Sequence, residues 1–333
     1  MKYILTLICL LVSLTISAQK AGFAVPKKSA PTVTKAKQPA AVQQGKKSHD
    51  KQIRPAKQKR YKGGKNQQSA AEPEVEVVQE VTPEEPKEEV PVRTPQEVIT
   101  SIFSVKGVSF TMCYVQGGTF MMGATPEQGE EVSDDEKPAH EVTVSSFYIG
   151  QTEVTQALWK AVMGKKPSKF KGDNLPVEQI SWNDCQTFIE KLNFMTGRTF
   201  RLPTEAEWEF AARGGNNSKD CMFSGSNYPD DVAWHSGNAN AKTHMVGTKQ
   251  ANELGIYDMC GNVSEWCADW YDDAYYQSND SQDPRGPISG SSRVVRGGSW
   301  SGNLKGCRVA FRFNGAQNEM NNSLGFRLVI TEW

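Results

Sequence analysis

GIYDMCGNVSEWCADWY, residues 255–271, carries the strongest structural information in this chain of 333 residues. It places two tryptophans and two tyrosines among glycine, asparagine and aspartate, the residues that favour turns. The chain on either side has the same character, with long runs rich in Gly, Asn, Asp and Ser that are interrupted by aromatic side chains. Loops this long inside a compact domain are normally functional or held by something extra, for which a bound ion or disulfide bonds would serve.

Short regular elements are predicted outside this stretch. The spacing of apolar residues indicates helices over residues 156–163, 182–193 and 205–213. The second helix begins at a Ser181 cap and the third at a Thr204 cap, each with an acidic capping partner three residues later. Strands are predicted over residues 110–115, 118–122, 140–149, 293–296 and 325–330. The sequence therefore predicts an α+β domain with few regular elements and much ordered loop.

Seven phrases in a fixed order cover nearly all of residues 110–330. They are GGTFMMG (117–123), TEVTQALWKAVMG (152–164), PVEQISWNDC (176–185), RLPTEAEWEFAARGG (201–215), the stretch quoted above, RVVRGGSW (293–300) and GFRLVI (325–330). Together they resemble the sulfatase-modifying-factor family, which includes the formylglycine-generating enzymes. For residues 105–333 the resemblance implies a loop-rich mixed fold that is distantly like C-type lectin domains.

The same resemblance implies chemistry that must be checked residue by residue, because a fold does not carry its function with it. The family's enzymes oxidise a cysteine of a nascent sulfatase to formylglycine. They use molecular oxygen, a copper-binding pair of cysteines and structural calcium.

A structural calcium site is the first implication of the family likeness. The matching positions are the Asp258 side chain, the carbonyls of Gly261 and Val263, and the Glu265 side chain. Such hard oxygen ligands are what Ca²⁺ prefers, and an ion here would neutralise two carboxylates and stiffen a long loop. The alternative is that Asp258 makes a turn and Glu265 pairs with an arginine.

The catalytic centre is where the chain departs from the family pattern. Counted from the RGGS phrase, Gly302 stands at the first copper-binding cysteine and Cys307 at the second. Counted back from residues 308–312, a short deletion is implied and Cys307 matches neither cysteine. Copper is therefore not expected, because a single thiolate holds Cu(I) poorly. The candidate catalytic residues are Cys307 and Ser299, the second matching a serine that lines the family's oxygen pocket.

Two further positions bear on catalysis. At the family's substrate-contacting tryptophan this chain has Ser264. A nucleophilic Cys307 acting alone, with His235 or His244 as its base, stays open from the sequence. Six cysteines follow residue 18, and their fifteen complete pairings are likewise left open.

The N-terminal third of the chain predicts export and a spacer. Residues 1–18 have the basic start, apolar run and small-residue end of a signal peptide. Residues 19–104 are predicted to be a disordered linker, first rich in lysine and then rich in proline and glutamate. The formal net charge of zero gives no reason to expect a nucleic-acid partner. No later segment is apolar enough to predict a transmembrane helix.

Two functions follow from these observations. The favoured prediction is a non-catalytic binding or scaffold module in the periplasm or at the cell surface, with a protein or peptide partner that includes envelope components. The alternative is a formylglycine-generating-type oxidoreductase acting on a cysteine of a protein substrate.

Overall fold

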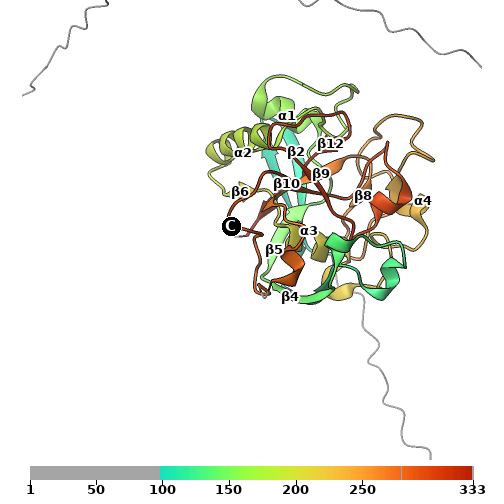
Figure 1. Ribbon diagram of the computed structural model, residues 1–333. Helices are drawn as coiled ribbons and strands as arrows, with labels where there is room; N and C mark the ends of the chain where they lie inside the picture. Colours follow the sequence, from blue (N-terminus) through green and yellow to red (C-terminus); the bar gives the residue numbers. More distant parts are fainter. Residues whose placement is uncertain (1–97, 279, 332–333) are drawn as a thin grey trace, which may run out of the picture. The chain divides into compact units, whose positions relative to one another are not determined.

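The computed structural model describes residues 98–278 and 280–331 (Figure 1). The signal peptide predicted over residues 1–18 and residues 19–97 of the predicted linker lie outside this part of the chain. The helices are α1 (Gln156–Met163), α2 (Trp182–Thr196), α3 (Glu205–Ala212) and α4 (Pro229–Val232), with 3-10 turns η1 (Pro126–Gln128), η2 (Asp134–Glu136), η3 (Gly215–Asn217), η4 (Tyr275–Gln277) and η5 (Leu304–Cys307). The strands are β1 (Thr100–Val105), β2 (Val108–Val115), β3 (Gly118–Met122), β4 (His140–Val144), β5 (Phe147–Gly150), β6 (Phe200–Arg201), β7 (Ala233–Trp234), β8 (Cys260–Gly261), β9 (Ser264–Trp270), β10 (Arg293–Arg296), β11 (Phe313–Gly315), β12 (Leu324–Gly325) and β13 (Val329–Ile330).

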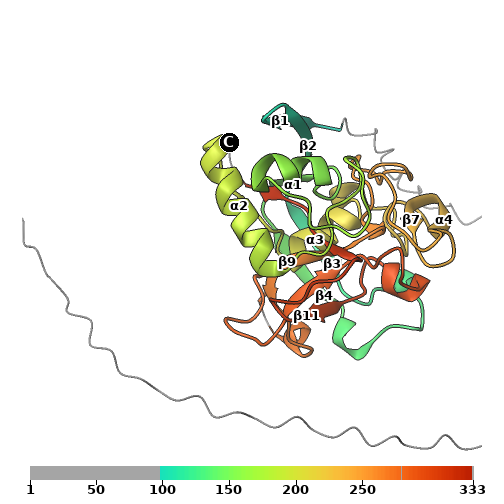
Figure 2. The same cartoon turned by 90° about the horizontal axis from the view of Figure 1, so that it is seen from above.

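The largest sheet has five strands in the order β1-β2-β5-β13-β6. The C-terminal strand β13 lies between β5 and β6, so the end of the domain sequence pairs inside the same sheet as the N-terminal strands β1 and β2. Helices α1 and α2 lie side by side along one flank of the domain (Figure 2). Their buried side chains, among them Trp159 and Phe188, pack with Phe326 into one hydrophobic core. A second, four-stranded sheet has the order β11-β10-β9-β12.

The helix starts follow the sequence signals. Helix α2 begins at Ser181, whose hydroxyl accepts from the Asp184 N–H, and helix α3 begins at Thr204 with the same arrangement. Helix α2 continues past the predicted end at residue 193, through Phe194 to Thr196, and stops at the left-handed Gly197. The apolar pattern missed this last turn because Phe194 is 92% exposed and does not belong to the buried stripe.

Two strands predicted as continuous are divided between sheets. Residues 140–149 form β4, which pairs with β3, and β5, which pairs with β2. The break falls at Ser145, whose N–H and hydroxyl both donate to the Asp283 carboxylate, at 2.6 and 2.7 Å. Residues 325–330 likewise divide into β12 and β13 around the buried Arg327. The apolar pattern of a strand cannot reveal such a break, because it does not show which neighbouring strand each half pairs with.

The ordered domain begins before residue 105, where the sequence placed its boundary. Strand β1 occupies Thr100–Val105 and pairs with β2 along its whole length. Its Phe103 ring stacks on Phe110 at 5.5 Å and meets Phe200 edge-on at 5.2 Å. Only one face of this edge strand is buried, and the exposed face carries Ile102.

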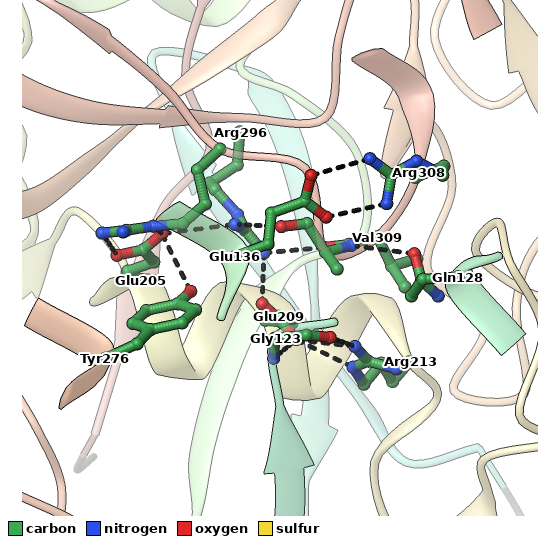
Figure 3. Close-up of polar contacts among 12 residues, drawn as sticks. Gly123, Gln128, Glu136, Glu205, Glu209, Arg213, Tyr276, Arg296, Arg308 and Val309 are labelled. Atoms are coloured by element: carbon green, nitrogen blue, oxygen red, sulfur yellow. Dashed lines mark hydrogen bonds and ion pairs between the residues drawn. The ribbon is translucent and has the colours of Figure 1, made fainter. Parts of the chain in front are cut away.

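A network of buried arginines and glutamates lies inside the domain (Figure 3). Glu205 accepts two hydrogen bonds from Arg312, at 2.7 and 2.9 Å, and one from Arg296 at 3.2 Å. Arg296 also pairs with Glu209, and the Tyr276 hydroxyl donates to Glu205. Burial alone would raise the pKa of Glu205, but the two arginines hold it below its usual value. This network was not predicted from the sequence.

The six cysteines of the described residues are all free thiols, and five of them are buried. The five buried cysteines act there as small apolar side chains. Within residues 98–278 and 280–331, no helix combines the length and the apolar character needed to cross a bilayer.

Candidate functional site

A groove runs beside the RGGS phrase and is called the RGGS groove here. Its volume is about 270 Å³. Ser264 of β9, Ser299 and Gly302 contribute to one part of its wall, and Asn321 and Ser323 to another. The Ser299 hydroxyl lies 3.2 Å from the hydroxyl of Ser301. The groove therefore combines hydroxyl and amide groups with a larger apolar surface, to which Val295, Leu324 and the exposed ring of Phe313 contribute, and it also holds the carboxylate of Glu319.

Cys307 does not belong to the lining of this groove. It ends the turn η5 and is fully buried. Gly298 separates it from the groove, since a Cβ atom on Gly298 would lie 3.0 Å from the Cys307 Sγ atom and 2.6 Å from the Gly306 carbonyl. Burial raises the pKa of the Cys307 thiol to about 12, although the Ser299 N–H partly opposes this. The two candidate catalytic residues are thus neighbours, but only Ser299 reaches the groove.

The histidines considered as bases have other partners. His235 places its Nε2 atom 2.9 Å from an Asp230 carboxylate oxygen. His244 stacks on Trp234 with 3.7 Å between ring centroids, and its Nε2 atom lies 2.8 Å from the Ala239 carbonyl. Neither histidine lines the RGGS groove.

The loop predicted to bind calcium holds one acid with an unused oxygen. Asp258 is buried, and its Oδ2 atom accepts from the Gly247 N–H at 2.7 Å. Its Oδ1 atom has no hydrogen-bond partner within the described part of the chain. Burial raises the pKa of Asp258 to about 6. A buried carboxylate oxygen left unpaired is costly, so this position suits a cation or a proton.

Glu265 is engaged more fully than Asp258. Its two oxygens accept from Arg327 Nη2 and Nε, each at 2.6 Å, and one also accepts from Trp208 Nε1 at 2.7 Å. The arginine pair that the sequence left as an alternative is therefore present.

A second unused carboxylate oxygen comes from Glu153, which the sequence did not single out. Glu153 is buried, its Oε1 atom accepts from Asn262 at 3.0 Å, and its Oε2 atom has no partner among the described residues. Burial raises the pKa of Glu153 well above its usual value, and the charges of Asp258 and Glu265 raise it further. The only sequence signal was its place in the TEVTQ phrase, which by itself does not indicate an ion.

These oxygens fit a hard cation in their chemistry. Glu153 and Asp258 are close enough for a hydrogen bond from Glu153 to lower the pKa of Asp258, so either a shared proton or a divalent cation would satisfy both buried oxygens. Among residues 98–278 and 280–331 no group of three or more His, Cys, Asp or Glu side chains is arranged to hold a metal. A cation would therefore depend on Asp258, Glu153 and backbone carbonyls such as those of Gly261 and Val263.

The fold and the RGGS groove together define a class of protein, the sulfatase-modifying-factor type. Residues 105–332 match the family model described as "Sulfatase-modifying factor enzyme 1-like domain", and the chain belongs to this family. The loop-rich α+β fold predicted from the sequence is confirmed by solved structures. Treponema denticola variable protein 1 aligns with a TM-score of 0.64 and 34% identity over 70% of this chain and 99% of its own. PvdO from Pseudomonas aeruginosa aligns with a TM-score of 0.62 and 26% identity over 70% of this chain and 98% of its own.

Curated relatives carry two different names. The chaperone protein LppX of Paenibacillus barcinonensis is 33% identical over 272 residues, which is 67% of this chain and 90% of LppX. The formylglycine-generating enzyme of Streptomyces coelicolor is 29% identical, over 63% of this chain and 86% of the enzyme. The family thus includes proteins named as enzymes and a protein named as a chaperone.

Proposed function

We propose that this chain is an exported, non-catalytic binding module of the cell envelope, located in the periplasm or at the cell surface. One observation carries the proposal: the wall of the RGGS groove has Gly302 where the family likeness implies a copper-binding cysteine, and Cys307 lies outside the groove. A module that keeps the groove but lacks a pair of thiols in it is suited to binding rather than to oxidation.

The chemistry of Cu(I) supports this proposal. Two thiolates hold the monovalent ion well, whereas one is a poor site. A thiol whose pKa is about 12 is almost entirely protonated at neutral pH, and the thiol form is neither a good ligand nor a good nucleophile. Cys307 is therefore expected to be inert in the folded protein.

A protein or peptide is the partner that the RGGS groove suits best. Ser264, Asn321 and Ser323 can hydrogen-bond the backbone of an extended segment, and Phe313 offers an apolar contact. A relative named as a chaperone is in keeping with a protein partner. Envelope components fit a protein that is exported, and the neutral net charge favours no nucleic acid.

The second candidate is a formylglycine-generating-type oxidase. Ser299 lines the groove, as the family likeness implies for the enzymes, and a curated relative carries the enzyme's name. This candidate requires copper at the groove, which gives the two functions opposite outcomes in one assay.

That assay supplies the first test. The full mature chain, incubated with Cu(I), oxygen and a synthetic peptide containing CxPxR, is expected to form no formylglycine, as judged by the peptide's mass. Equilibrium dialysis is expected to show no stoichiometric, thiol-bound copper. The Streptomyces coelicolor enzyme under the same conditions is the positive control. Conversion of the peptide that is lost in Cys307→Ser would establish the oxidase instead.

We also propose a structural calcium ion beside Asp258. Two buried oxygen atoms without hydrogen-bond partners, Asp258 Oδ1 and Glu153 Oε2, support the site. The charge of Glu265 is already neutralised by Arg327. The carbonyls of Gly261 and Val263 are the further ligands that the family likeness implies. Calcium would hold the loop around residues 258–265 in place. It would thereby fix the start of β9, where Ser264 lines the RGGS groove.

A further inference from the structure

A separate apolar pocket lies between the acidic loop that follows β3 and the turn η5. Its volume is about 350 Å³, at the lower end of the range for ligand sites. Its apolar lining comes from Met222, Phe223, Pro229 and Leu304. Leu304 is 40% exposed although it is aliphatic. This pocket, called the Leu304 pocket below, shares no lining residue with the RGGS groove.

The rim of the Leu304 pocket is acidic. Glu130 and Glu131 line it, both are exposed, and neither carboxylate has an ion pair or hydrogen bond within the described part of the chain. The one lysine in the lining, Lys305, is directed toward the Phe311 ring, 5.9 Å away. The rim therefore offers two unneutralised carboxylates against one ammonium group, which favours a cationic ligand.

Arg308 adds a polar feature to the wall. Its Nη1 and Nη2 atoms are both paired with Glu136, at 2.7 Å each, so its charge is neutralised. Its Nε–H is buried and has no acceptor among residues 98–278 and 280–331. Figure 3 shows Arg308 and Gln128 on the same side of the polar network, well apart from Glu205. This atom is enclosed by the protein and does not face the pocket, so Arg308 contributes to the wall only as one half of a neutralised ion pair.

We propose that the Leu304 pocket binds a bulky apolar side chain of a protein partner, flanked in the partner's sequence by lysine or arginine. The apolar walls would take the side chain, and Glu130 and Glu131 would pair with the flanking cations. This inference rests on the proposed function as a binding module and gives it a second contact site.

The size of the pocket favours one anchor residue rather than a longer segment. A volume of 350 Å³ equals that of roughly twelve liquid water molecules, enough for one large side chain. Single buried anchors surrounded by a polar rim supply most of the energy in many protein interfaces. The rim charges would raise the rate of encounter and select the partner, because exposed ion pairs add little affinity.

The test uses the full mature chain with ¹³C-labelled methionine methyl groups, assigned for Met222 with Met222→Leu. The probe is the peptide acetyl-Ser-Gly-Lys-Phe-Arg-Gly-Ser-amide. Control peptides carry alanine in place of Phe, or glutamate in place of both Lys and Arg. The basic peptide is expected to shift the Met222 methyl signal with a dissociation constant of about 0.1–1 mM, since a single anchor gives weak binding. Leu304→Asp is expected to abolish the shift.

A charge exchange separates the proposal from non-specific binding. Glu130→Lys combined with Glu131→Lys is expected to weaken the basic peptide by about tenfold and to let the acidic peptide bind instead. Both glutamates are exposed, so the variant should fold, and circular dichroism checks this. Equal binding of the alanine peptide, or no response to charge exchange, would overturn the proposal. The proposal would also be overturned if free p-cresol shifted the Met222 signal and the basic peptide did not, because that result would indicate a small-molecule site.

These outcomes are independent of the copper assay. Formylglycine formation would refute the non-catalytic function while leaving the Met222 response unchanged. Conversely, a silent Met222 signal would remove the second contact site and leave the RGGS groove as the binding surface.

Discussion

Replacing Glu205 by alanine is expected to lower the free energy of unfolding by about 3–5 kcal/mol, the usual cost of removing one partner from a buried ion pair. Glu205 is bonded to both Arg296 and Arg312, each of them buried, and to the Tyr276 hydroxyl. Without this carboxylate, Arg312 would lose its only acidic partner in the described part of the chain. Urea denaturation followed by tryptophan fluorescence measures the change as a lower midpoint at constant m-value.

Two matched variants give this prediction its control. Glu205→Gln keeps the shape but removes the charge, so its loss should be of similar size to that of alanine. Glu141→Ala removes an exposed glutamate of β4 and should change stability by no more than about 0.5 kcal/mol. A loss below about 1 kcal/mol for both Glu205 variants would mean that the arginines find water or other acceptors, contrary to the buried network described.

Removing calcium is expected to have the second largest effect. With free calcium at 100–1,000 times the dissociation constant, chelation by EDTA should lower the free energy of unfolding by about 3–4 kcal/mol and the Tm accordingly. The cause is the loss of the cation bound by both buried carboxyl groups, which leaves Asp258 and Glu153 to share a proton instead. Differential scanning calorimetry with and without EDTA measures the shift.

The effect of substitutions at this site on stability should reverse when calcium is removed. With calcium present, Glu153→Gln and Asp258→Asn are expected to be less stable than the natural sequence, because a ligand is lost. In EDTA they are expected to be equally or more stable, because an unpaired buried charge is removed. Asp273→Asn, which removes an exposed acid, should retain the full response to EDTA. A natural sequence indifferent to EDTA and calcium would disprove the calcium proposal.

The pH dependence of the calcium-free protein gives a further prediction. Burial raises the pKa of Asp258 to about 6, whereas an unfolded aspartate titrates near about 3.9. Between these values folded Asp258 binds more protons than it does in the unfolded chain, so its contribution to stability in EDTA should fall as the pH rises from about 4 to 6. Asp269, whose pKa burial raises to about 8, acts in the same direction. In EDTA, the urea midpoint of Asp258→Asn should therefore change less with pH than that of the natural sequence, but it should still change.

Local signals in the sequence predicted local structure well. The caps at Ser181 and Thr204 placed the starts of helices α2 and α3, because a cap is satisfied within its own helical turn. The break at Ser145 could not be found in this way, since it depends on Asp283, far along the chain.

The candidate site shows the same division. The family likeness brought attention to Ser299, Cys307 and Asp258, but the burial of Cys307 depends on how Gly298 packs against η5. Glu153 was missed because its partner Asn262 lies more than a hundred residues away. Single-sequence patterns carry no information on such pairs, which only the tertiary fold creates.

The packing of Gly298 also limits what a single substitution could add to the RGGS groove. A cysteine at position 302 would meet only ordinary contacts with Ser299, so one sulfur could be added to the groove by a single substitution. The other sulfur, on Cys307, would still lie behind the backbone of Gly298. Bringing two sulfurs into the groove would therefore need a change in the main chain around Gly298 as well as the new side chain at position 302.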